Sequence, residues 1–527
     1  MTYDAIVVGA GMAGLTAAAY LSKEGHKTLL VERQDYVGGL VNSFPYKEFV
    51  FDGGIRAIEN SGIVTPMLRQ LGIDIDFIPS TVSLGIEDDV ITIRSKEDVK
   101  DYHSLLHKHF PNNKTDIDNI MKDIYKIMDY MDILYGIDNP LFLDMKKDRK
   151  YLIKTILPWV FKYLFTVGKI KKFNPPVDEF LRRHTDNQVL IDVIAQHFFQ
   201  KTPAFFALSY FSLYLDYNYP RGGTGSLPEH LKQFILEHGG EIQLKTTITK
   251  IDPTKRILFD DQGNEYTYKE LIWAGDNRFL YNNLDLSGMP DDKIKSTILQ
   301  QRDMIGDKRG GDSIYTIYAT ADLGVDYFQP IHSGHFFYTP TKVGLFDAMS
   351  RREAILATDD KDTILQWLND YYDYNTYEVS IPALRDETLA PKGKVAMIIS
   401  TLFDYDIVNH IRKLGWYDEF KTYSENRILA VLESSIYPGL SKHIIDKFSS
   451  TPLTLQQRTG NTDGAITGWA FTNSMMPAEH RLPKIARSVD TVIPHIHQAG
   501  MWTFSPSGMP VSILTGKLAA DKVNKAL

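Results

Sequence analysis

The chain of 527 residues contains no cysteine. This absence excludes disulfide bonds, zinc sites with thiolate ligands, cysteine-ligated iron–sulfur clusters and a flavin linked through a cysteine. Positive charge is also in deficit, with 58 lysines and arginines against 66 aspartates and glutamates and a net charge of −8. Because nucleic-acid binding needs a basic surface, we expect no nucleic-acid partner.

Long hydrophobic runs are missing as well. No stretch of about twenty uncharged apolar residues occurs, so we expect no membrane-spanning helix. The first apolar strand is predicted within five residues of Met1, which argues against a secretory signal and favours a cytoplasmic protein. The motifs of serine hydrolases, zinc proteases and P-loop nucleotidases are absent, and we expect no metal site.

The residues that are present begin with a strand–helix–strand pattern. Residues 5–8 are an apolar, β-branched run typical of a buried strand, and residues 12–23 predict a helix with an alanine-rich packing face. Gly25 follows as the glycine that ends the helix. Residues 28–31 predict a second strand with Glu32 at its tip. The order is that of a βαβ unit.

Three glycines join the first strand to the helix, and their spacing predicts a dinucleotide site. Gly9 permits a tight turn, Gly11 lets a diphosphate approach the backbone, and Gly14 lets helix and strand pack closely. The helix N-terminus attracts the diphosphate. Glu32 lies 23 residues after Gly9, where it would accept hydrogen bonds from a ribose and repel the 2′-phosphate of NADP. A glycine-rich turn without a ligand is the alternative.

Later segments resemble flavoproteins rather than NAD enzymes. The double glycine in residues 37–40 and the stretch FVFDGGIRA (residues 49–57) resemble the extended signature of two-dinucleotide-binding-domain flavoproteins. The C-terminal stretch, residues 496–523, resembles the FAD motif of the phytoene desaturase, carotenoid isomerase and retinol saturase family. Residues 219–252 and 451–469 also fit that family.

The resemblance implies FAD as the cofactor and a set of residues that bind it. The FAD-contacting residues would be Gly9, Gly11, Met12, Ala13, Gly14, Glu32, Arg33, Gly38, Gly39, Leu40, Gly54, Ile55, Arg56, Ile248, Gly500, Met501, Met509, Pro510 and Val511. Arg56 is the one candidate catalytic residue, because it would polarise the flavin ring or stabilise its anionic reduced form. A structural ion pair is the alternative for Arg56.

We expect an α/β protein with a discontinuous Rossmann-like FAD-binding domain, an α+β substrate domain with a sheet floor, and a helical insertion that contacts membranes. The expected segments are 1–75, 216–290 and 486–527 for the FAD-binding domain, 76–130 and 291–485 for the substrate domain, and 131–215 for the insertion. A firm helix is predicted over residues 116–135 by apolar residues at three- and four-residue spacing.

The insertion contains an aromatic-rich helical stretch, residues 151–173. Six apolar residues are expected on one helical face, namely Ile153, Ile156, Leu157, Val160, Leu164 and Val167, with Lys154, Lys162 and Lys169 roughly opposite. Pro158 is expected to break the stretch or to begin its second part. The pattern is typical of a helix that lies in a membrane interface. A buried helical pair with extended lysines is the alternative.

The resemblance implies an enzyme that acts on carbon–carbon double bonds of a long apolar polyene, a carotenoid or retinoid, by hydride transfer at flavin N5. Desaturation, saturation and cis–trans isomerisation are all consistent with the motifs, and no electron donor or acceptor is indicated. An amine- or protoporphyrinogen-oxidase-like flavoprotein is the second hypothesis. A membrane-docked protein with purely structural FAD is the third. His495 and His497 are expected to be satisfied strand histidines, with a place in the site as the alternative.

Overall fold

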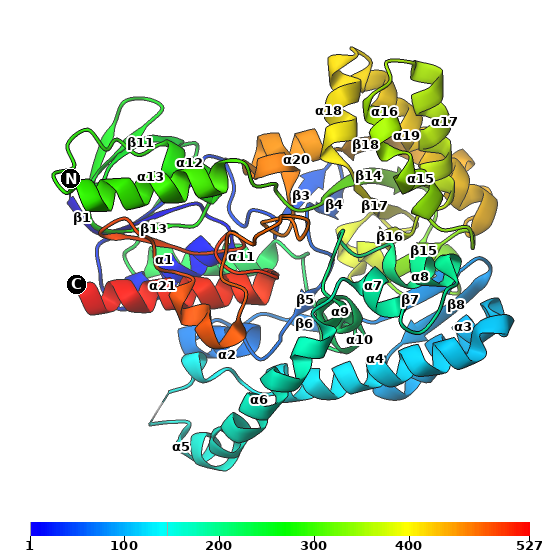
Figure 1. Ribbon diagram of the computed structural model, residues 1–527, viewed down its shortest axis with the longest axis horizontal. Coiled ribbons are helices and arrows are strands. Elements are labelled where there is room, and N and C mark those ends of the chain that lie inside the picture. Colours follow the sequence, from blue (N-terminus) through cyan, green and yellow to red (C-terminus); the bar gives the residue numbers. More distant parts are fainter. Residues whose placement is uncertain (1, 145) are drawn as a thin grey trace.

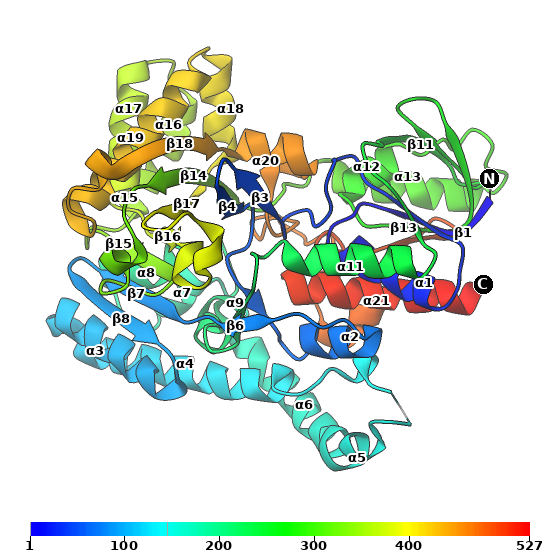
Figure 2. The same ribbon diagram turned by 180° about the vertical axis from the view of Figure 1, so that it is seen from behind.

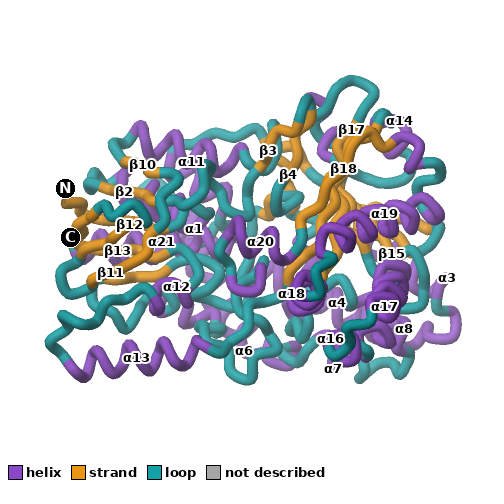
Figure 3. Tube along the Cα trace, turned by 90° about the horizontal axis from the view of Figure 1, so that it is seen from above, coloured by secondary structure: helices purple, strands orange, loops and turns teal. Residues whose placement is uncertain are grey.

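The computed structural model describes residues 2–144 and 146–527. Two sheets of seven strands each organise the fold, one near both termini and one at the other end of the molecule (Figures 1 and 3). The first sheet has the order β10 (Glu241–Gln243), β2 (Thr28–Val31), β1 (Thr2–Val8), β13 (Glu265–Trp273), β12 (Ile257–Asp260) and β11 (Ile248–Asp252), and β19 (Ile496–Gln498) also pairs with β13.

The first sheet is mainly parallel, as the expected βαβ unit requires. Strands β10, β2, β1, β13 and β19 run parallel, and β12 and β11 form an antiparallel extension. Helix α1 (Met12–Lys23) has the predicted bounds, and Gly25 beyond it has a φ of 81°. Helices α11 (Ser226–Glu237) and α21 (Met509–Ala526) pack against α1. Segments from both ends and the middle of the chain therefore build one domain.

The second sheet is mixed and forms the floor of the other lobe. Its order is β18 (Ile444–Ser450), β14 (Ser313–Ala321), β17 (Val395–Phe403), β16 (Tyr377–Ser380), β15 (His335–Thr339), β7 (Val82–Ile86) and β8 (Asp89–Ile93). Helices α17 (Lys361–Asp373), α18 (Tyr405–Lys413) and α19 (Tyr417–Ser435) share a buried core with one face of this sheet. The predicted sheet floor with helices behind it is confirmed.

Two small sheets and several short helices complete these lobes. The small sheets are β3 (Ser43–Tyr46) with β4 (Phe49–Asp52), and β5 (Ile58–Glu59) with β9 (Tyr217–Pro220) and β6 (Phe77–Pro79). The remaining helices of the two lobes are α2 (Val64–Leu71), α12 (Asn277–Asn282), α13 (Asp292–Gly306), α14 (Val325–Phe328), α15 (Phe346–Ser350), α16 (Arg352–Leu356) and α20 (Pro452–Thr459).

A helical region lies along one side of the molecule (Figures 1 and 2). It comprises α3 (Val99–His109), α4 (Lys114–Tyr135), α5 (Arg149–Tyr151), a π-helical turn (Leu152–Ile156), α6 (Leu157–Ile170), α7 (Val177–Leu181), α8 (Gln188–Ala195), α9 (Ala204–Leu208) and α10 (Tyr210–Leu213). The predicted helix over residues 116–135 is confirmed. The six-segment division of the chain into domains stays a prediction.

Helix α6 projects from this region (Figure 2), and part of its apolar surface is exposed. Pro158 lies in its first turn, as expected. The predicted six-residue stripe is divided, because Ile156 and Val167 pack inward while Leu157 and Leu164 are each 60% exposed. Other exposed apolar side chains here are Ile153, Val160, Phe161 and Phe165. Among the described helices, none has the length and apolar character to cross a membrane.

Candidate flavin and substrate site

One cavity of about 510 Å³ joins the two lobes. Its walls come from the glycine loop, the segments after β2 and β4, the ends of β11 and β13, the floor sheet, and the start of α21. A volume in this range is usual for a cofactor or small-molecule site. Sixteen of the nineteen residues predicted to bind FAD line this cavity, and Gly14, Pro510 and Val511 do not.

The three glycines of the loop have three different environments. Gly9 has a φ of 101°, which favours glycine. A Cβ added to Gly14 would lie 1.8 Å from the carbonyl oxygen of Gly9, so Gly14 allows the helix to pack on the strand. A Cβ added to Gly11 would meet no atom within 4 Å, because Gly11 borders the cavity. That space is where a diphosphate would approach the first turn of α1.

The loop after β2 closes over the glycine loop. The Glu32 carboxylate accepts hydrogen bonds from the backbone N–H groups of Ala10 (2.8 Å) and Gln34 (2.8 Å). The Gly38 N–H donates to the Ala10 carbonyl at 2.7 Å. Gly39 has a φ of 60°, and its added Cβ would lie 3.3 Å from the Gly11 Cα. Glu32 is thus fixed at the cavity wall beside the loop.

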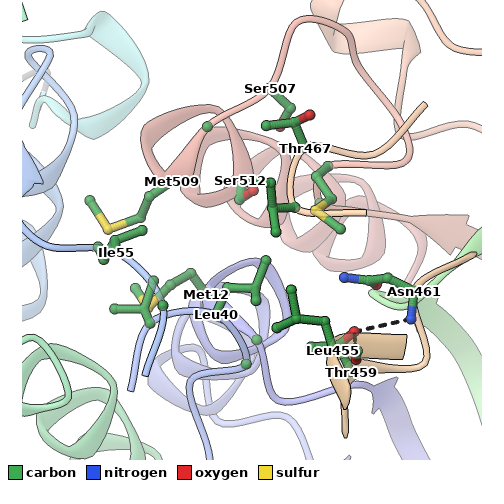
Figure 4. Close-up of a pocket in the computed structure, with 18 of the residues that line it drawn as sticks. Met12, Leu40, Ile55, Leu455, Thr459, Asn461, Thr467, Ser507, Met509 and Ser512 are labelled. Atoms are coloured by element: carbon green, nitrogen blue, oxygen red, sulfur yellow. Dashed lines mark hydrogen bonds between the residues drawn. The ribbon is translucent and has the colours of Figure 1, made fainter. Parts of the chain in front are cut away.

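The C-terminal motif forms the opposite wall. Figure 4 shows Met509 and Ser512 of α21 facing Met12 and Leu40 across the cavity, with Ile55 beside Met509. Gly500 has a φ of 98°, and its N–H donates to the Thr515 hydroxyl at 2.9 Å. Another side of the cavity is lined by Asn461, Thr459 and Leu455 (Figure 4).

Arg56 is buried at the cavity wall, with 2% of its surface exposed. Its guanidinium donates to the carbonyls of Asp52 and Gly54 and to the Ser400 hydroxyl (2.9 Å). Its Nε is buried without a hydrogen-bond partner among the described residues. Among the described residues Arg56 forms no ion pair, because backbone carbonyls and a hydroxyl accept the hydrogen bonds of its guanidinium.

The floor sheet and its neighbours add a polar wall that sequence reasoning missed. We define the polar wall as Glu59, His197, His335 and Glu378, all of which line the cavity. His335 Nε2 lies 2.8 Å from the Glu378 carboxylate, and the His335 ring stacks on Tyr217. Burial raises the pKa of Glu59 to about 7 and lowers that of His197 to about 4.

Aromatic side chains surround the polar wall. The cavity-lining rings near it are Phe198, Phe199, Phe206, Tyr210, Tyr217 and Phe337. Burial lowers the pKa of His335, and the nearby histidine helps to hold the pKa of Glu378 below its usual value. At neutral pH the pair is therefore a neutral imidazole that donates to a carboxylate. The wall offers hydrogen bonds within an otherwise aromatic chamber.

His495 and His497 do not line the cavity. Both lie against the Glu270 carboxylate, at 2.7 Å and 3.3 Å, as expected of histidines outside the site. Only His497 belongs to strand β19, and its Nδ1 is buried without a hydrogen-bond partner among the described residues, so the expectation of two satisfied strand histidines is met only in part. One signal for the polar wall was present in the sequence, because Glu59 follows Arg56 by three residues and lies just beyond the segment predicted to pass the flavin. His335 and Glu378 are 43 residues apart and meet only through strand pairing.

A Rossmann-type domain with a glycine cradle, joined to a second lobe with a sheet floor, is the architecture of an FAD-dependent oxidoreductase. The chain belongs to the family of flavin containing amine oxidoreductases, whose model matches residues 12–298. This family implies FAD as the cofactor. The cradle fits it, because Gly11 leaves open space at a helix N-terminus where a side chain would block a diphosphate.

The curated relatives confirm the resemblance to polyene-modifying flavoproteins. The chain is 24% identical to a chloroplastic prolycopene isomerase of Daucus carota, over 88% of this chain and 71% of the relative. It is 22% identical to an inactive all-trans-retinol 13,14-reductase of Danio rerio, over 91% of this chain and 78% of the relative. It is also 22% identical to a 4,4′-diapophytoene desaturase of Staphylococcus aureus, over 98% of each.

Solved structures share the fold at low identity. An oxidoreductase from Methanosarcina mazei aligns over 100% of both chains with a TM-score of 0.60 and 15% identity. A putrescine oxidase variant aligns over 100% of both chains with a TM-score of 0.61 and 13% identity. Reduced UDP-galactopyranose mutase aligns over 100% of this chain and 96% of its own chain, with a TM-score of 0.58 and 13% identity. These similarities describe the fold alone.

Proposed function

We propose that the protein is an FAD-dependent enzyme that acts on carbon–carbon double bonds of a long apolar polyene, a carotenoid or retinoid. The relatives support this proposal because three of them carry names of carotenoid or retinol enzymes and match along most of the chain. The observation that carries it is that one cavity continues from the glycine cradle into an aromatic chamber. A cofactor in the cradle and an apolar substrate in the chamber would then meet.

Each end of the cavity has a proposed task. The predicted FAD-binding residues that line the cavity would hold FAD. Gly14 would contribute by letting helix α1 pack closely on the glycine loop. Bound FAD would supply a hydride acceptor or donor for a carbon–carbon bond. Arg56 would place positive charge beside the cofactor and polarise it. The aromatic rings of the chamber would orient the polyene and exclude water.

Glu59 is our candidate for the group that carries the proton. Desaturation or saturation moves a proton together with the hydride, and the most effective acid–base groups have a pKa near the working pH. Glu59 lines the cavity with its pKa raised to about 7. It lies beside the start of α21, since a Cβ added to Gly508 would be 3.5 Å from its carboxylate. Isomerisation without net redox change would not need this proton transfer.

The exposed face of α6 would give the enzyme access to substrates dissolved in a membrane. Phe161 and Phe165 are 63% and 73% exposed, and Lys154, Lys162 and Lys169 are also exposed on the same helical stretch. An apolar helical surface next to lysines is typical of a helix that binds an anionic membrane interface. We therefore propose a peripheral attachment to membrane surfaces through α6.

The polar wall favours one alternative, an amine- or protoporphyrinogen-oxidase-like enzyme. Glu378 keeps one carboxylate oxygen on His335, and it lines the chamber together with the rings of Tyr210 and Tyr217. A carboxylate among aromatic faces is a suitable environment for an ammonium group. A pure hydrocarbon would offer this wall no hydrogen-bond partner.

One experiment separates the two functions. Express the protein in cells that make phytoene, lycopene isomers or retinol, and compare the pigments by chromatography with those from cells carrying an E59Q variant. The polyene function predicts a new desaturated, saturated or isomerised product in at least one host. Unchanged pigments in all hosts, together with oxygen consumption on amines by the purified protein, would replace it with the alternative.

A further inference from the structure

A second cluster of ligating side chains lies outside the cavity, on the helical hairpin of α3 and α4. His103 and His107 are four residues apart and therefore lie on one face of α3. The short turn at residues 110–113 brings the first turns of α4 back against that face, which places Asp118 beside both rings. His103 Nε2 and His107 Nε2 lie 2.7 Å and 3.0 Å from the same oxygen, Asp118 Oδ1.

Hydrogen bonding accounts for only part of this arrangement. His103 makes a hydrogen bond with Asp118 Oδ1, whereas His107 Nε2 is sealed from solvent and has no hydrogen-bond partner among the described residues. The two imidazole rings lie 4.4 Å apart between centroids, and both Nε2 atoms lie within 3.0 Å of the same carboxylate oxygen. A sealed nitrogen atom that lies 3.0 Å from a carboxylate oxygen without a hydrogen bond calls for another partner.

We propose that His103, His107 and Asp118 form a binding site for a divalent transition metal ion, Zn²⁺ by preference. Two imidazole nitrogens and one carboxylate oxygen are ligands that Zn²⁺ accepts, at about 2.0–2.2 Å each. In a tetrahedral site such ligands are about 3.3 Å apart. The observed 2.7 Å and 3.0 Å would need to open by about 0.6 Å and about 0.3 Å.

Three protein ligands leave the fourth position of the metal to water. The three side chains are partly exposed, with side-chain exposures of 28–46%, so the ion has a route from solvent. A bound ion would fasten α3 to α4, and α4 is the helix on which α6 packs. The metal would therefore stabilise the helical region and has no part in the chemistry of the cavity.

The test is a calorimetric titration of the FAD-loaded protein with Zn²⁺ at pH 7.5, after treatment with a chelator. The wild-type protein is expected to bind one Zn²⁺ ion and to melt at a higher temperature when loaded. H107A and D118N should each weaken Zn²⁺ binding by more than about tenfold, since even outer-shell changes weaken metal sites that much. Asparagine keeps the shape of Asp118, so D118N should fold normally.

A matched control is available on the same helical region. His184 Nε2 lies 3.1 Å from Asp123 Oδ2, a histidine–aspartate pair without a second histidine ligand. H184A should therefore bind Zn²⁺ as the wild-type protein does. If the wild type binds no stoichiometric Zn²⁺, or if H107A and D118N bind it as tightly as H184A does, the proposed site is wrong.

Discussion

The glycine cradle predicts opposite effects for two alanine substitutions three residues apart. Gly11 has a φ of −69° and a ψ of 176°, which alanine adopts freely, and its added Cβ would meet no atom. Such a substitution stabilises a folded chain by about 0.4–1 kcal/mol through the unfolded state. The apoprotein of G11A should therefore melt at or slightly above the temperature of the wild-type apoprotein.

FAD binding should respond in the other direction. The new methyl group of G11A would occupy the space reserved for the diphosphate, and overpacking of that kind costs about 1–3 kcal/mol. Since 1.4 kcal/mol is a factor of ten, FAD should bind roughly 5- to 150-fold more weakly. Fluorescence titration of the apoprotein with FAD measures this change directly.

Gly14→Ala is the matched comparison, because its Cβ would lie 1.8 Å from the Gly9 carbonyl oxygen. That clash with backbone should cost the apoprotein about 1–3 kcal/mol of stability before any cofactor is added. Gly306→Ala, at a position with open space that does not line the cavity, should change FAD affinity in neither direction. If G11A binds FAD as tightly as Gly306→Ala does, the diphosphate does not lie where we place it.

Three further predictions concern single groups. Because burial penalises the ionised form of Glu59, the wild type should lose up to about 3 kcal/mol of unfolding free energy relative to E59Q as the pH rises from 4.5 to 7. Denaturant unfolding at each pH measures this difference. Parallel curves of stability against pH for the two proteins would refute the raised pKa. F161E/F165E should reduce binding to anionic lipid vesicles at least about tenfold, whereas I445E, at an exposed apolar residue on β18, should not. E32Q should weaken FAD binding by roughly tenfold, because a charged hydrogen-bond acceptor becomes neutral. If E32Q binds FAD as tightly as the wild type does, this role of Glu32 is wrong.

The cofactor half of the site was predictable because it depends on local sequence. Gly9, Gly11 and Gly14 act within one turn, and the strand before them and the helix after them follow from hydrophobic periodicity. The helix bounds at Met12 and Lys23 were correct for the same reason. The exposed side of α6 was predicted less well. Periodicity groups apolar residues on a face, but only the tertiary fold decides that Ile156 packs inward while Leu157 stays exposed.

The polar wall depends on sheet register, which the sequence does not display. Antiparallel pairing of β15 with β16 sets Phe337 opposite Glu378 and His335 opposite Ser380, so His335 reaches Glu378 diagonally. Glu59 comes from a different segment, 276 positions before His335.

The difference between a local cofactor motif and a wall built by distant segments has a consequence for function. The glycine motif identifies a cofactor class shared by many enzymes, whereas in our proposal the chamber selects the substrate. At 22–24% identity, a relative's substrate can be transferred to this chain only as far as the relative also carries a polar wall among aromatic rings. Substitution of Glu378 or Glu59 should therefore change which polyene or amine is accepted more than it changes FAD affinity, and the reverse should hold for Gly11.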